Sequence, residues 1–510
     1  MNESLGYVQE KDEEYKSLKY KAASGVFLLG VRRVAIQFIQ TASSIILARL
    51  LFPEVFGAFA IALFIVSFFT VFTDIGFGTA LIQQKGVIEK KQIQTLFTTQ
   101  ITLSVLVTVL LYILAPYISL LYQAQLGPNG TLYLRQLSLI IVLLAARNLP
   151  ATLLERDIRY GKFVIGEIGE ILLTQVVTVG FVLLGQKGVE SFIWGTLAGK
   201  GIGTILFMFL AKWEFGFSFS LRELQKILPF GIPFQTSQIV GQLNAAIIPI
   251  LVGFLAGSAG VGFVNWAGGV AALPRVMLEI VSRVIFPVAA RLQDSKKQLG
   301  NALERTLQLT NLSSFPIIVL VFVLAPEITY IVFTDKWLLG VSALYLFSIQ
   351  SIFVLIGSIV SNTLLALGEA KFIRNVQVAQ TILLWILSVP LIKAFGFTGY
   401  ALASLTVSVI FFWLPLKALR SHLPFQVWSH TWQYLVYSGV MGGMVFVLAR
   451  IWVVHTVWQL LFIIGVGMLF YLLLLWWRKR YEIQEDVRRI RRLVLAGTFH
   501  IHKPAGTVNE

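Results

Sequence analysis

Apolar runs of about 20 residues recur along almost the whole chain, and no other feature of the sequence limits the fold as strongly. A helix of about 20 apolar residues can cross the roughly 30 Å hydrocarbon core of a bilayer. Such runs fit about fourteen times between residues 24 and 477. Because lipid offers no partner to a free backbone N–H or C=O group, each run is expected to be helical. The sequence therefore predicts an all-α polytopic membrane protein.

The composition also favours a membrane protein. Hydrophobic residues make up 57% of the 510 residues, charged residues 13%, and the mean hydropathy is +0.79. The net charge of +16 could suggest nucleic-acid binding in a soluble chain, but here the basic residues fall mostly between the apolar runs. The side opposite the N-terminal tail holds only a few of them: Lys187, Lys336, Lys393 and Arg450. Basic loops stay cytoplasmic, so we expect both termini in the cytoplasm and no nucleic-acid partner.

Several functions are excluded by what the sequence lacks. The chain has no cysteine, which removes disulfides, thiolate metal sites and cysteine nucleophiles. No GxxxxGK[ST] motif occurs, so ATP is not expected to be the direct fuel. The loops between the runs are too short to fold as separate domains. We therefore predict no catalytic residues, no metal site and no cofactor.

Charged residues within one apolar run point most strongly to a functional site. The run from 273 to 291 carries Arg275, Glu279 and Arg283 at i, i+4 and i+8, so the three side chains share one helix face. Each charge is costly in hydrocarbon unless it meets a partner or a water-filled cavity. One interpretation is a cationic lining of a cavity. The other is a self-neutralised helix packed inside a bundle.

Further cations lie within other predicted spans, and the deepest are Arg32, Arg33 and Lys200. Lys200 is about midway along its span, so we expect either a cavity or a carboxylate partner for it. Arg49 and Arg147 lie near span ends, where arginine side chains more often extend to the membrane surface.

The acidic residues inside the spans allow two interpretations. Asp74 and Glu279 are deep enough for burial to favour proton uptake, so either could couple transport to H⁺ or Na⁺. Either could equally be a fixed counter-ion to an arginine, and the sequence leaves both open. Glu167 and Glu170 lie nearer the cytoplasmic end of their span, where a solvated or paired surface acid is expected.

Polar stripes run along two more helices. Gln37, Gln40 and Thr41 lie along the first predicted span, residues 24–50, and Gln238 and Gln242 lie along the seventh, residues 229–256, which the eighth follows at 259–290. Such stripes cannot face lipid without leaving polar groups unsatisfied. They are expected either to line a polar cavity or to join helices by hydrogen bonds.

An internal repeat with an offset of 205 residues aligns several positions, among them Gly57 with Gly262 and Asp74 with Glu279. Transporters are often built from two related bundles with the substrate between them. The predicted organisation is a cytoplasmic tail, two six-helix lobes, an added helix pair and a basic cytoplasmic tail. These correspond to residues 1–21, 22–212, 213–420, 421–477 and 478–510.

The basic tail is expected to contain an amphipathic helix. Ile483, Val487, Ile490 and Val494 recur at i, i+4, i+7 and i+11 among arginines. Such a helix next to a membrane span is expected to lie on the anionic inner leaflet, and docking of a partner protein is the alternative.

Four stretches of the sequence resemble a known family. They are LARLLFPEVFGAFAIALFIVSFFTVFTDIGFGTALIQQKG, LLERDIRYGKF, PRVMLEIVSRVIFPVAARLQD and FTDKW. Over most of residues 20 to 420 the chain resembles bacterial polysaccharide-export flippases, the Wzx branch of the multidrug/oligosaccharidyl-lipid/polysaccharide superfamily. The resemblance implies a MATE-like fold and movement of undecaprenyl-pyrophosphate-linked oligosaccharide from the inner to the outer leaflet of the bacterial cytoplasmic membrane. It also implies alternating access coupled to an ion gradient.

The residues fit this function because a lipid pyrophosphate with a polar glycan needs a hydrated, cationic path. Arginine offers bidentate phosphate contacts and lysine a point charge. The predicted ligands are Arg32, Arg33, Lys200, Arg275 and Arg283. The expected partners are the lipid-linked oligosaccharide, membrane lipids and, from the resemblance, a polysaccharide polymerase and assembly proteins.

Two alternatives remain at this stage. A MATE-type ion-coupled drug antiporter would take mostly cationic compounds and needs an acidic cavity. Basic residues outnumber acidic ones among the deep charges of the predicted spans, which disfavours this alternative. A polyprenyl-glycan polymerase or ligase would need a sizeable outer loop with catalytic residues, and the loops are short.

Overall fold

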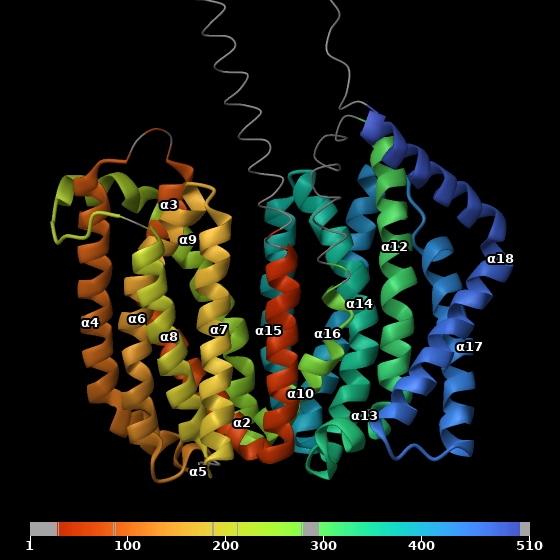
Figure 1. Cartoon of the computed structure of the whole chain (residues 1–510), viewed down its shortest axis with the longest axis horizontal. Coiled ribbons are helices and arrows are strands. Elements are labelled where there is room, and N and C mark those ends of the chain that lie inside the picture. Colours follow the sequence, from red (N-terminus) through yellow and green to blue (C-terminus); the bar gives the residue numbers. More distant parts are fainter. Residues whose placement is uncertain are drawn as a thin grey trace, which may run out of the picture. The chain divides into compact units, whose positions relative to one another are not determined.

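The structure is a computed structural model, and it describes residues 28, 30–84, 86, 88–185, 188–211, 213–276, 278 and 295–499 (Figure 1). At some helical positions only the backbone is described, namely residues 226, 228, 230–234, 236, 237, 240, 429, 430 and 479–499. Helices dominate the described residues, and no β-strand occurs among them. The prediction of an all-α chain is confirmed for these residues.

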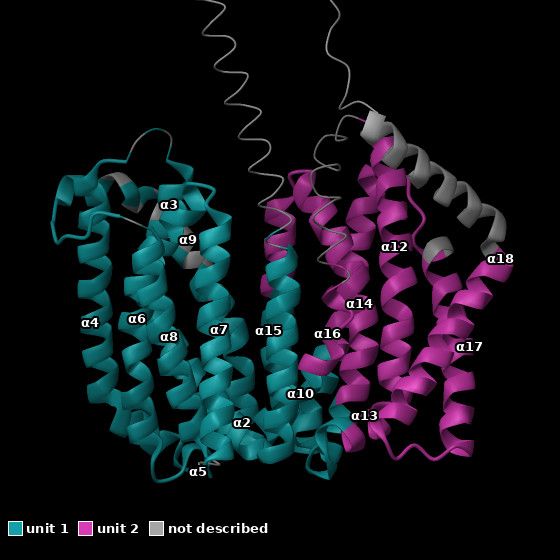
Figure 2. Ribbon diagram, in the orientation of Figure 1, with its two compact units in different colours: residues 1–268, 332–343, 379–404 teal, residues 269–331, 344–378, 405–510 magenta. Residues whose placement is uncertain are grey.

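The chain divides into two compact units, which Figure 2 colours separately. Unit 1 contains residues 1–268, 332–343 and 379–404, and unit 2 contains residues 269–331, 344–378 and 405–510. This division follows contacts and differs from the predicted lobes, whose boundary at residue 212 stays a prediction.

Unit 1 begins with a helix at residues 30–50. The elements that follow are α2 (Pro53–Thr70), the 3₁₀ helix η1 (Val71–Thr73), α3 (Phe77–Gln83), α4 (Lys90–Leu121), α5 (Gln123–Leu126), α6 (Gly130–Arg156), α7 (Tyr160–Leu183), α8 (Val189–Ala211), α9 (Leu221–Ala245), the π-helix η2 (Ile248–Val252) and most of α10 (Gly253–Ala271). Pro53 is well placed at the start of α2, because the first helical turn needs no N–H donor there.

The second half of the chain is also helical. It contains α12 (Lys296–Val323), α13 (Ala325–Ile328), the π-helix η3 (Thr329–Phe333), the 3₁₀ helix η4 (Asp335–Gly340), α14 (Val341–Ala366), α15 (Ala370–Phe395), α16 (Phe397–His422), α17 (Val427–Ile451) and α18 (Val457–Phe499). Helices α14, α15 and α16 each contribute residues to both units.

Among the described residues, twelve helical segments are long and apolar enough to cross a membrane. Helix 30–50 is not one of them, and the predicted first span extends beyond its described part. One segment, Gly241–Ala271, covers the later part of the predicted seventh span and the beginning of the predicted eighth. Much of the predicted eighth span, residues 259–290, lies outside the described residues. The multi-span membrane architecture is confirmed, and the count of fourteen stays a prediction.

The segment Gly241–Ala271 is broken at Gly257. The backbone there has φ 74° and ψ 179°, which an L-residue rarely adopts and glycine adopts freely. The break lies between the predicted seventh span, which ends at residue 256, and the eighth, which begins at 259. The chain therefore changes direction where the sequence predicts a boundary.

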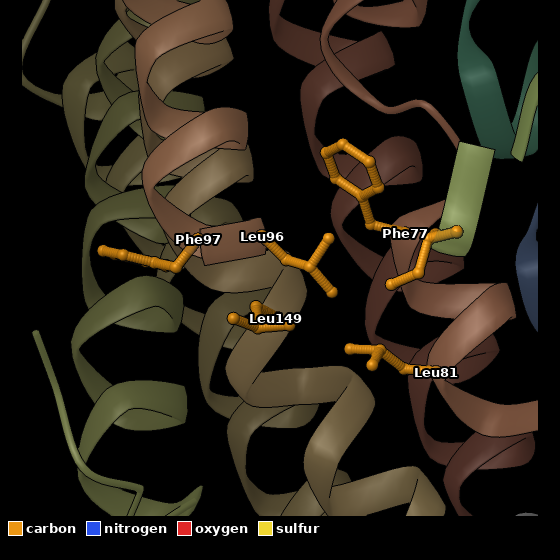
Figure 3. Close-up of a cluster of buried hydrophobic side chains, with 6 residues drawn as sticks. Phe77, Leu81, Leu96, Phe97 and Leu149 are labelled. Carbon is orange, nitrogen blue, oxygen red and sulfur yellow. The ribbon is translucent and has the colours of Figure 1, made fainter. Parts of the chain in front are cut away.

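A hydrophobic cluster in unit 1 joins short α3 to the longer helices around it (Figure 3). Phe77 and Leu81 from α3 pack with Leu96 and Phe97 from α4 and with Leu149 from α6. All five side chains are at most 1% exposed. Their burial fixes α3 against α4 and α6. Hydrophobic packing therefore helps to hold the turn between α2 and α3 in place.

The last helix, α18, runs without interruption from the final predicted span into the basic tail. The helical prediction for residues 483–494 is confirmed by the backbone. Side chains of residues 479–499 lie outside the description, so contact of the tail with lipid stays a prediction.

Candidate functional site

Helices α7 and α8 approach each other closely because glycines of α8 face α7. A Cβ atom on Gly199 would lie 1.8 Å from Thr174 Oγ1, and one on Gly203 would lie 2.5 Å from Glu170 Oε2. Small residues allow membrane helices to pack backbone to backbone in this way. The close approach brings Lys200 of α8 within reach of the carboxylate on α7.

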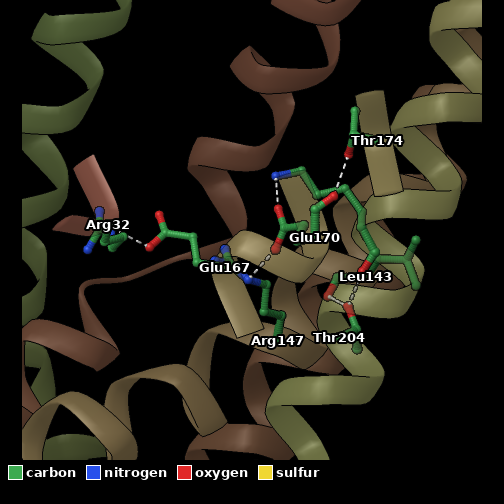
Figure 4. A network of polar contacts seen from close by, with 8 residues as sticks. Arg32, Leu143, Arg147, Glu167, Glu170, Thr174 and Thr204 are labelled. Carbon is green, nitrogen blue, oxygen red and sulfur yellow. Dashed lines mark hydrogen bonds and ion pairs between the residues drawn. The ribbon is translucent and has the colours of Figure 1, made fainter. Parts of the chain in front are cut away.

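Glu170 of α7 lies at the centre of the site. Lys200 Nζ is 2.6 Å from Glu170 Oε1, and Arg147 Nε of α6 is 2.8 Å from Glu170 Oε2. The Glu170 side chain is only 5% exposed. Figure 4 shows Arg147 and Glu170 directed toward each other. One buried carboxylate thus connects cations from two other helices.

A second ion pair lies on the same helix, one turn earlier. Arg32 Nε of helix 30–50 is 2.8 Å from Glu167 Oε2 (Figure 4). These two side chains are 25% and 19% exposed. Aromatic rings cover both arginines, since the Arg32 guanidinium lies 5.6 Å from the Phe163 ring centre and that of Arg147 lies 4.7 Å from the Phe207 ring centre. The rings add a favourable cation–π contribution to the pairing.

Glu155 of α6 lies within electrostatic reach of Arg32, Arg147 and Glu167. We call the six charged residues the charge cluster: Arg32, Arg147, Glu155, Glu167, Glu170 and Lys200. Three cations face three carboxylates, so the formal charges balance. Since unpaired charge is costly inside a membrane, the balance explains how these helices can hold so many ionisable groups.

The sequence predictions for these residues meet different outcomes. Lys200 is predicted to have a cavity or a carboxylate partner, and it has the carboxylate of Glu170. Glu170 is expected to be a solvated or paired surface acid; it is paired, but its position at the surface is wrong, because its side chain is buried. The interpretation of Arg147 as a surface-seeking arginine is wrong as well, because it pairs with that buried acid. The sequence contains the two acids at i and i+3, but it does not show which cations they meet.

The predicted polar stripes are satisfied partly within the protein. Gln37 Nε2 donates a hydrogen bond to Thr41 Oγ1 at 3.2 Å, along the same helix. Gln40 and Gln238 are exposed, whereas Gln242 is half-buried. Lining of a polar cavity by these residues stays a prediction.

Asp74, which follows η1, accepts hydrogen bonds from neutral groups. Its Oδ1 accepts from the Gly76 backbone N–H at 3.0 Å, and its Oδ2 accepts from Asn148 Nδ2 at 3.3 Å. Gly76 has φ 69°, so the carboxylate stabilises a turn that favours glycine. Within the described part of the chain, Asp74 forms no ion pair. The counter-ion interpretation is therefore not supported by a described arginine.

The remaining predicted cations lie apart from the charge cluster or outside the description. Arg33, next to Arg32 on the same helix, has an exposed side chain. Arg275 is exposed as well, and it forms no ion pair with the residues that the structure describes. Glu279 and Arg283 lie outside the described residues, so the predicted ladder on residues 273–291 is not tested.

The charge cluster connects helices through buried ion pairs. Among the described residues, no group of three His, Cys, Asp or Glu side chains could hold a metal ion. The ion pairs join helix 30–50, α6, α7 and α8 at one level of unit 1. Helices joined in this way resist separation, because removing one partner of a buried pair leaves an uncompensated charge.

Comparisons with known proteins identify similar sequences and folds. Residues 46–342 match the family described as polysaccharide biosynthesis protein. Lipopolysaccharide biosynthesis protein WzxC of Escherichia coli is 24% identical over 402 residues, which are 77% of this chain and 80% of that protein.

Two solved structures share the fold. The lipid II flippase MurJ in an inward closed conformation superposes with a TM-score of 0.74 at 17% identity, over 89% of this chain and 99% of that one. An inward-facing multidrug resistance MATE family transporter of the MOP superfamily gives a TM-score of 0.58 at 16% identity, over 77% and 98% of the two chains. The MATE-like fold predicted from the sequence is confirmed.

Proposed function

This chain belongs to the polysaccharide biosynthesis protein family, whose members are transporters, and from this premise we propose that it moves a lipid-linked oligosaccharide across a membrane. We propose undecaprenyl-pyrophosphate-linked oligosaccharide as the substrate and transfer from the inner to the outer leaflet as the direction. The match over residues 46–342 carries the proposal, and the MurJ-like fold supports it. Membership of a transporter family also removes the polymerase and ligase alternatives.

The pyrophosphate is proposed to meet the exposed cations first. Arg33 and Arg275 both have exposed side chains, and Arg275 has no carboxylate partner among the described residues. An arginine can bind phosphate through two parallel N–H donors, so each of these side chains suits a phosphate group. Arg283 is proposed to join them because it shares the predicted helix face of Arg275.

Arg32 and Lys200 are proposed to act from within the charge cluster. Arg32 uses Nε for Glu167, and a guanidinium has five N–H donors, so the pair leaves others for a phosphate oxygen. Lys200 is 28% exposed despite its bond to Glu170. The carboxylates thereby hold these cations in place and leave some of their N–H donors available for a phosphate oxygen.

The finer features of the mechanism complete the proposal. We propose fourteen transmembrane helices in two six-helix lobes and a helix pair, both termini in the cytoplasm, and a location in the bacterial cytoplasmic membrane. Alternating access is proposed to be coupled to H⁺ or Na⁺, with Asp74 or Glu279 as the coupling group. A polysaccharide polymerase and assembly proteins are proposed as partners on the product side.

The decisive experiment measures the leaflet in which the lipid-linked glycan resides. Cells with and without the gene are treated with an impermeant glycan-modifying reagent, and the modified fraction is compared. We expect deletion to lower that fraction and the wild-type gene to restore it. Arg33→Ala combined with Arg275→Ala should fail to restore it at equal membrane levels.

Arg450→Ala is the matched control, because Arg450 is an exposed arginine stacked on Phe446 at 5.2 Å and lies outside the proposed site. An unchanged modified fraction after deletion would reject the flippase function. Increased sensitivity of the deletion strain to cationic drugs, with normal glycan exposure, would favour the antiporter alternative.

A further inference from the structure

Two short segments of unit 1 meet backbone to backbone, and the contact is reciprocal. A Cβ atom on Gly57 of α2 would lie 1.7 Å from the Ser258 carbonyl oxygen. A Cβ atom on Gly262 of α10 would lie 2.1 Å from the Pro53 carbonyl oxygen. Neither glycine can carry a side chain in this arrangement. The start of α2 and the second part of α10 therefore approach closely because each presents a glycine to the other's backbone.

The partners of these contacts are related by the internal repeat. Gly57 and Gly262 differ by 205 positions, and so do Pro53 and Ser258. Gly57 contacts Ser258, which is the counterpart of Pro53. Gly262, which is the counterpart of Gly57, contacts Pro53. A contact in which each side repeats the other is the signature of a two-fold axis. The two repeats thus meet here as the halves of a symmetric dimer would.

Two hydrogen bonds also connect the repeats, one donated from each repeat to a carbonyl of the other. Trp337 Nε1 of η4 donates to the Ala48 carbonyl at 2.9 Å, and Gln125 Nε2 of α5 donates to the Gly253 carbonyl at 2.9 Å. Ala48 and Gly253 also differ by 205 positions. The Ala48 carbonyl lies in the last turn of helix 30–50, and the Gly253 carbonyl lies four residues before the break at Gly257, so each repeat supplies a donor to a carbonyl of the other.

Aromatic packing strengthens one side of this contact. Trp337 is 1% exposed, and its ring lies 5.2 Å from Phe56 and 5.5 Å from Trp266. Lys336, the preceding residue, bonds the Arg49 carbonyl at 3.0 Å and lies 4.6 Å from the Phe52 ring. We call residues 48–57, 125, 253–262 and 336–337 the reciprocal clasp.

We propose that the reciprocal clasp is a gate whose glycine contacts and two carbonyl hydrogen bonds hold one end of the transport path closed. The gate rests on the proposed transport function. Ala48 is sixteen residues along its helix from Arg32, which is about 24 Å at 1.5 Å per residue. The clasp is therefore at the end of helix 30–50 opposite the charge cluster. The glycine contacts and the two carbonyl hydrogen bonds involve no charged group, so they can separate without breaking an ion pair, which suits a surface that must open and close.

A cross-linking experiment tests the gate directly, because the chain has no cysteine of its own. Phe52→Cys and Lys336→Cys are combined and joined with a short bifunctional thiol reagent. We expect efficient joining, at least a tenfold loss of glycan translocation, and recovery when a cleavable linker is reduced. Each single-cysteine variant with the same reagent is the control. Full translocation by the joined protein, or failure of the pair to join, would overturn the proposal.

A second measurement does not depend on the substrate. Ala48→Cys places a thiol at a position that is 2% exposed, and an impermeant thiol reagent reports its accessibility. Adding Gly57→Ala or Gly262→Ala should raise the labelling rate severalfold and by similar factors, because the two glycines are counterparts. Gly180→Ala is the control, since nothing lies within 4 Å of a Cβ atom there. Unchanged labelling in both glycine variants would contradict the gate even if the flippase function held.

Discussion

The charge cluster and the reciprocal clasp lie at opposite ends of helix 30–50, and they are held by different forces. The cluster joins helices through ion pairs of 2.6 to 2.8 Å around a carboxylate that is 5% exposed. The clasp uses glycine contacts, two neutral hydrogen bonds of 2.9 Å and one bond from the Lys336 ammonium to a backbone carbonyl. Losing one partner of a buried ion pair costs about 3–5 kcal/mol, whereas a neutral hydrogen bond contributes about 1 kcal/mol.

This difference indicates which contacts can move during transport. Separating the helices of the cluster would leave charges uncompensated in a low-dielectric region, so helix 30–50, α6, α7 and α8 are expected to stay together. Opening the clasp breaks neutral hydrogen bonds and aromatic contacts, and it releases the Lys336 ammonium from the Arg49 carbonyl without breaking a described ion pair. We therefore expect unit 1 to change its conformation at the clasp during transport.

The largest expected effect follows from removing the central carboxylate. Glu170→Gln leaves Arg147 and Lys200 without their shared counter-ion, so we expect a loss of about 3–5 kcal/mol in unfolding free energy. Chemical unfolding of the purified protein in detergent measures it. The double variant Glu170→Gln with Lys200→Met should recover part of the loss. Wild-type stability of Glu170→Gln would show that the cluster does not hold these helices.

A smaller effect is expected from crowding the contact between α7 and α8. In Gly203→Ala the new Cβ would lie 2.5 Å from Glu170 Oε2, so we expect a loss of about 1–3 kcal/mol. Gly201→Ala is the matched control on the same helix, because nothing lies within 4 Å of a Cβ atom at that position. Unfolding midpoints of the two variants are compared. Equal midpoints would mean that the close approach at Gly203 is not needed.

The clasp is tested by removing one hydrogen-bond donor at a time. Trp337→Phe deletes the bond to the Ala48 carbonyl, which should lower stability by about 0.5–1.5 kcal/mol, and it also removes part of a buried ring, which adds to the loss. Gln125→Met deletes the counterpart bond to Gly253 and should have a similar effect. Translocation by each variant is measured at matched membrane levels. A large loss of translocation in one variant and none in the other would show that the two hydrogen bonds are not equivalent.

The smallest stability change is expected at Asp74. In Asp74→Asn the side chain keeps an oxygen that accepts from the Gly76 N–H, so stability should stay within about 1 kcal/mol of wild type. Translocation should nevertheless fall and lose its dependence on the ion gradient if Asp74 is the coupling group. Normal, gradient-dependent translocation would assign the coupling elsewhere.

Much of the fold follows from the sequence because hydrophobic length and helical period are local properties. The runs of about 20 apolar residues predict the spanning helices, and the boundary near residue 257 coincides with the break at Gly257.

The charge cluster could be predicted only in part. The depth of Lys200 in its span requires a partner or a cavity, and this much is correct. The identity of the partner depends on which face of α7 meets α8, and the glycines that bring those faces together determine it. Glu170 and Arg147 are far apart in sequence and meet only after α6, α7 and α8 have packed. Pairing of charges between helices is a tertiary property that a single sequence does not display.

The most direct measurement of translocation uses the purified protein in liposomes that contain fluorescent undecaprenyl-pyrophosphate-linked oligosaccharide. An impermeant quencher reports how much glycan faces outward over time. We predict that wild type and Arg450→Ala carry glycan from one leaflet to the other and that Arg33→Ala with Arg275→Ala does not. Equal rates in protein-free liposomes and in liposomes with the wild-type chain would contradict a flippase.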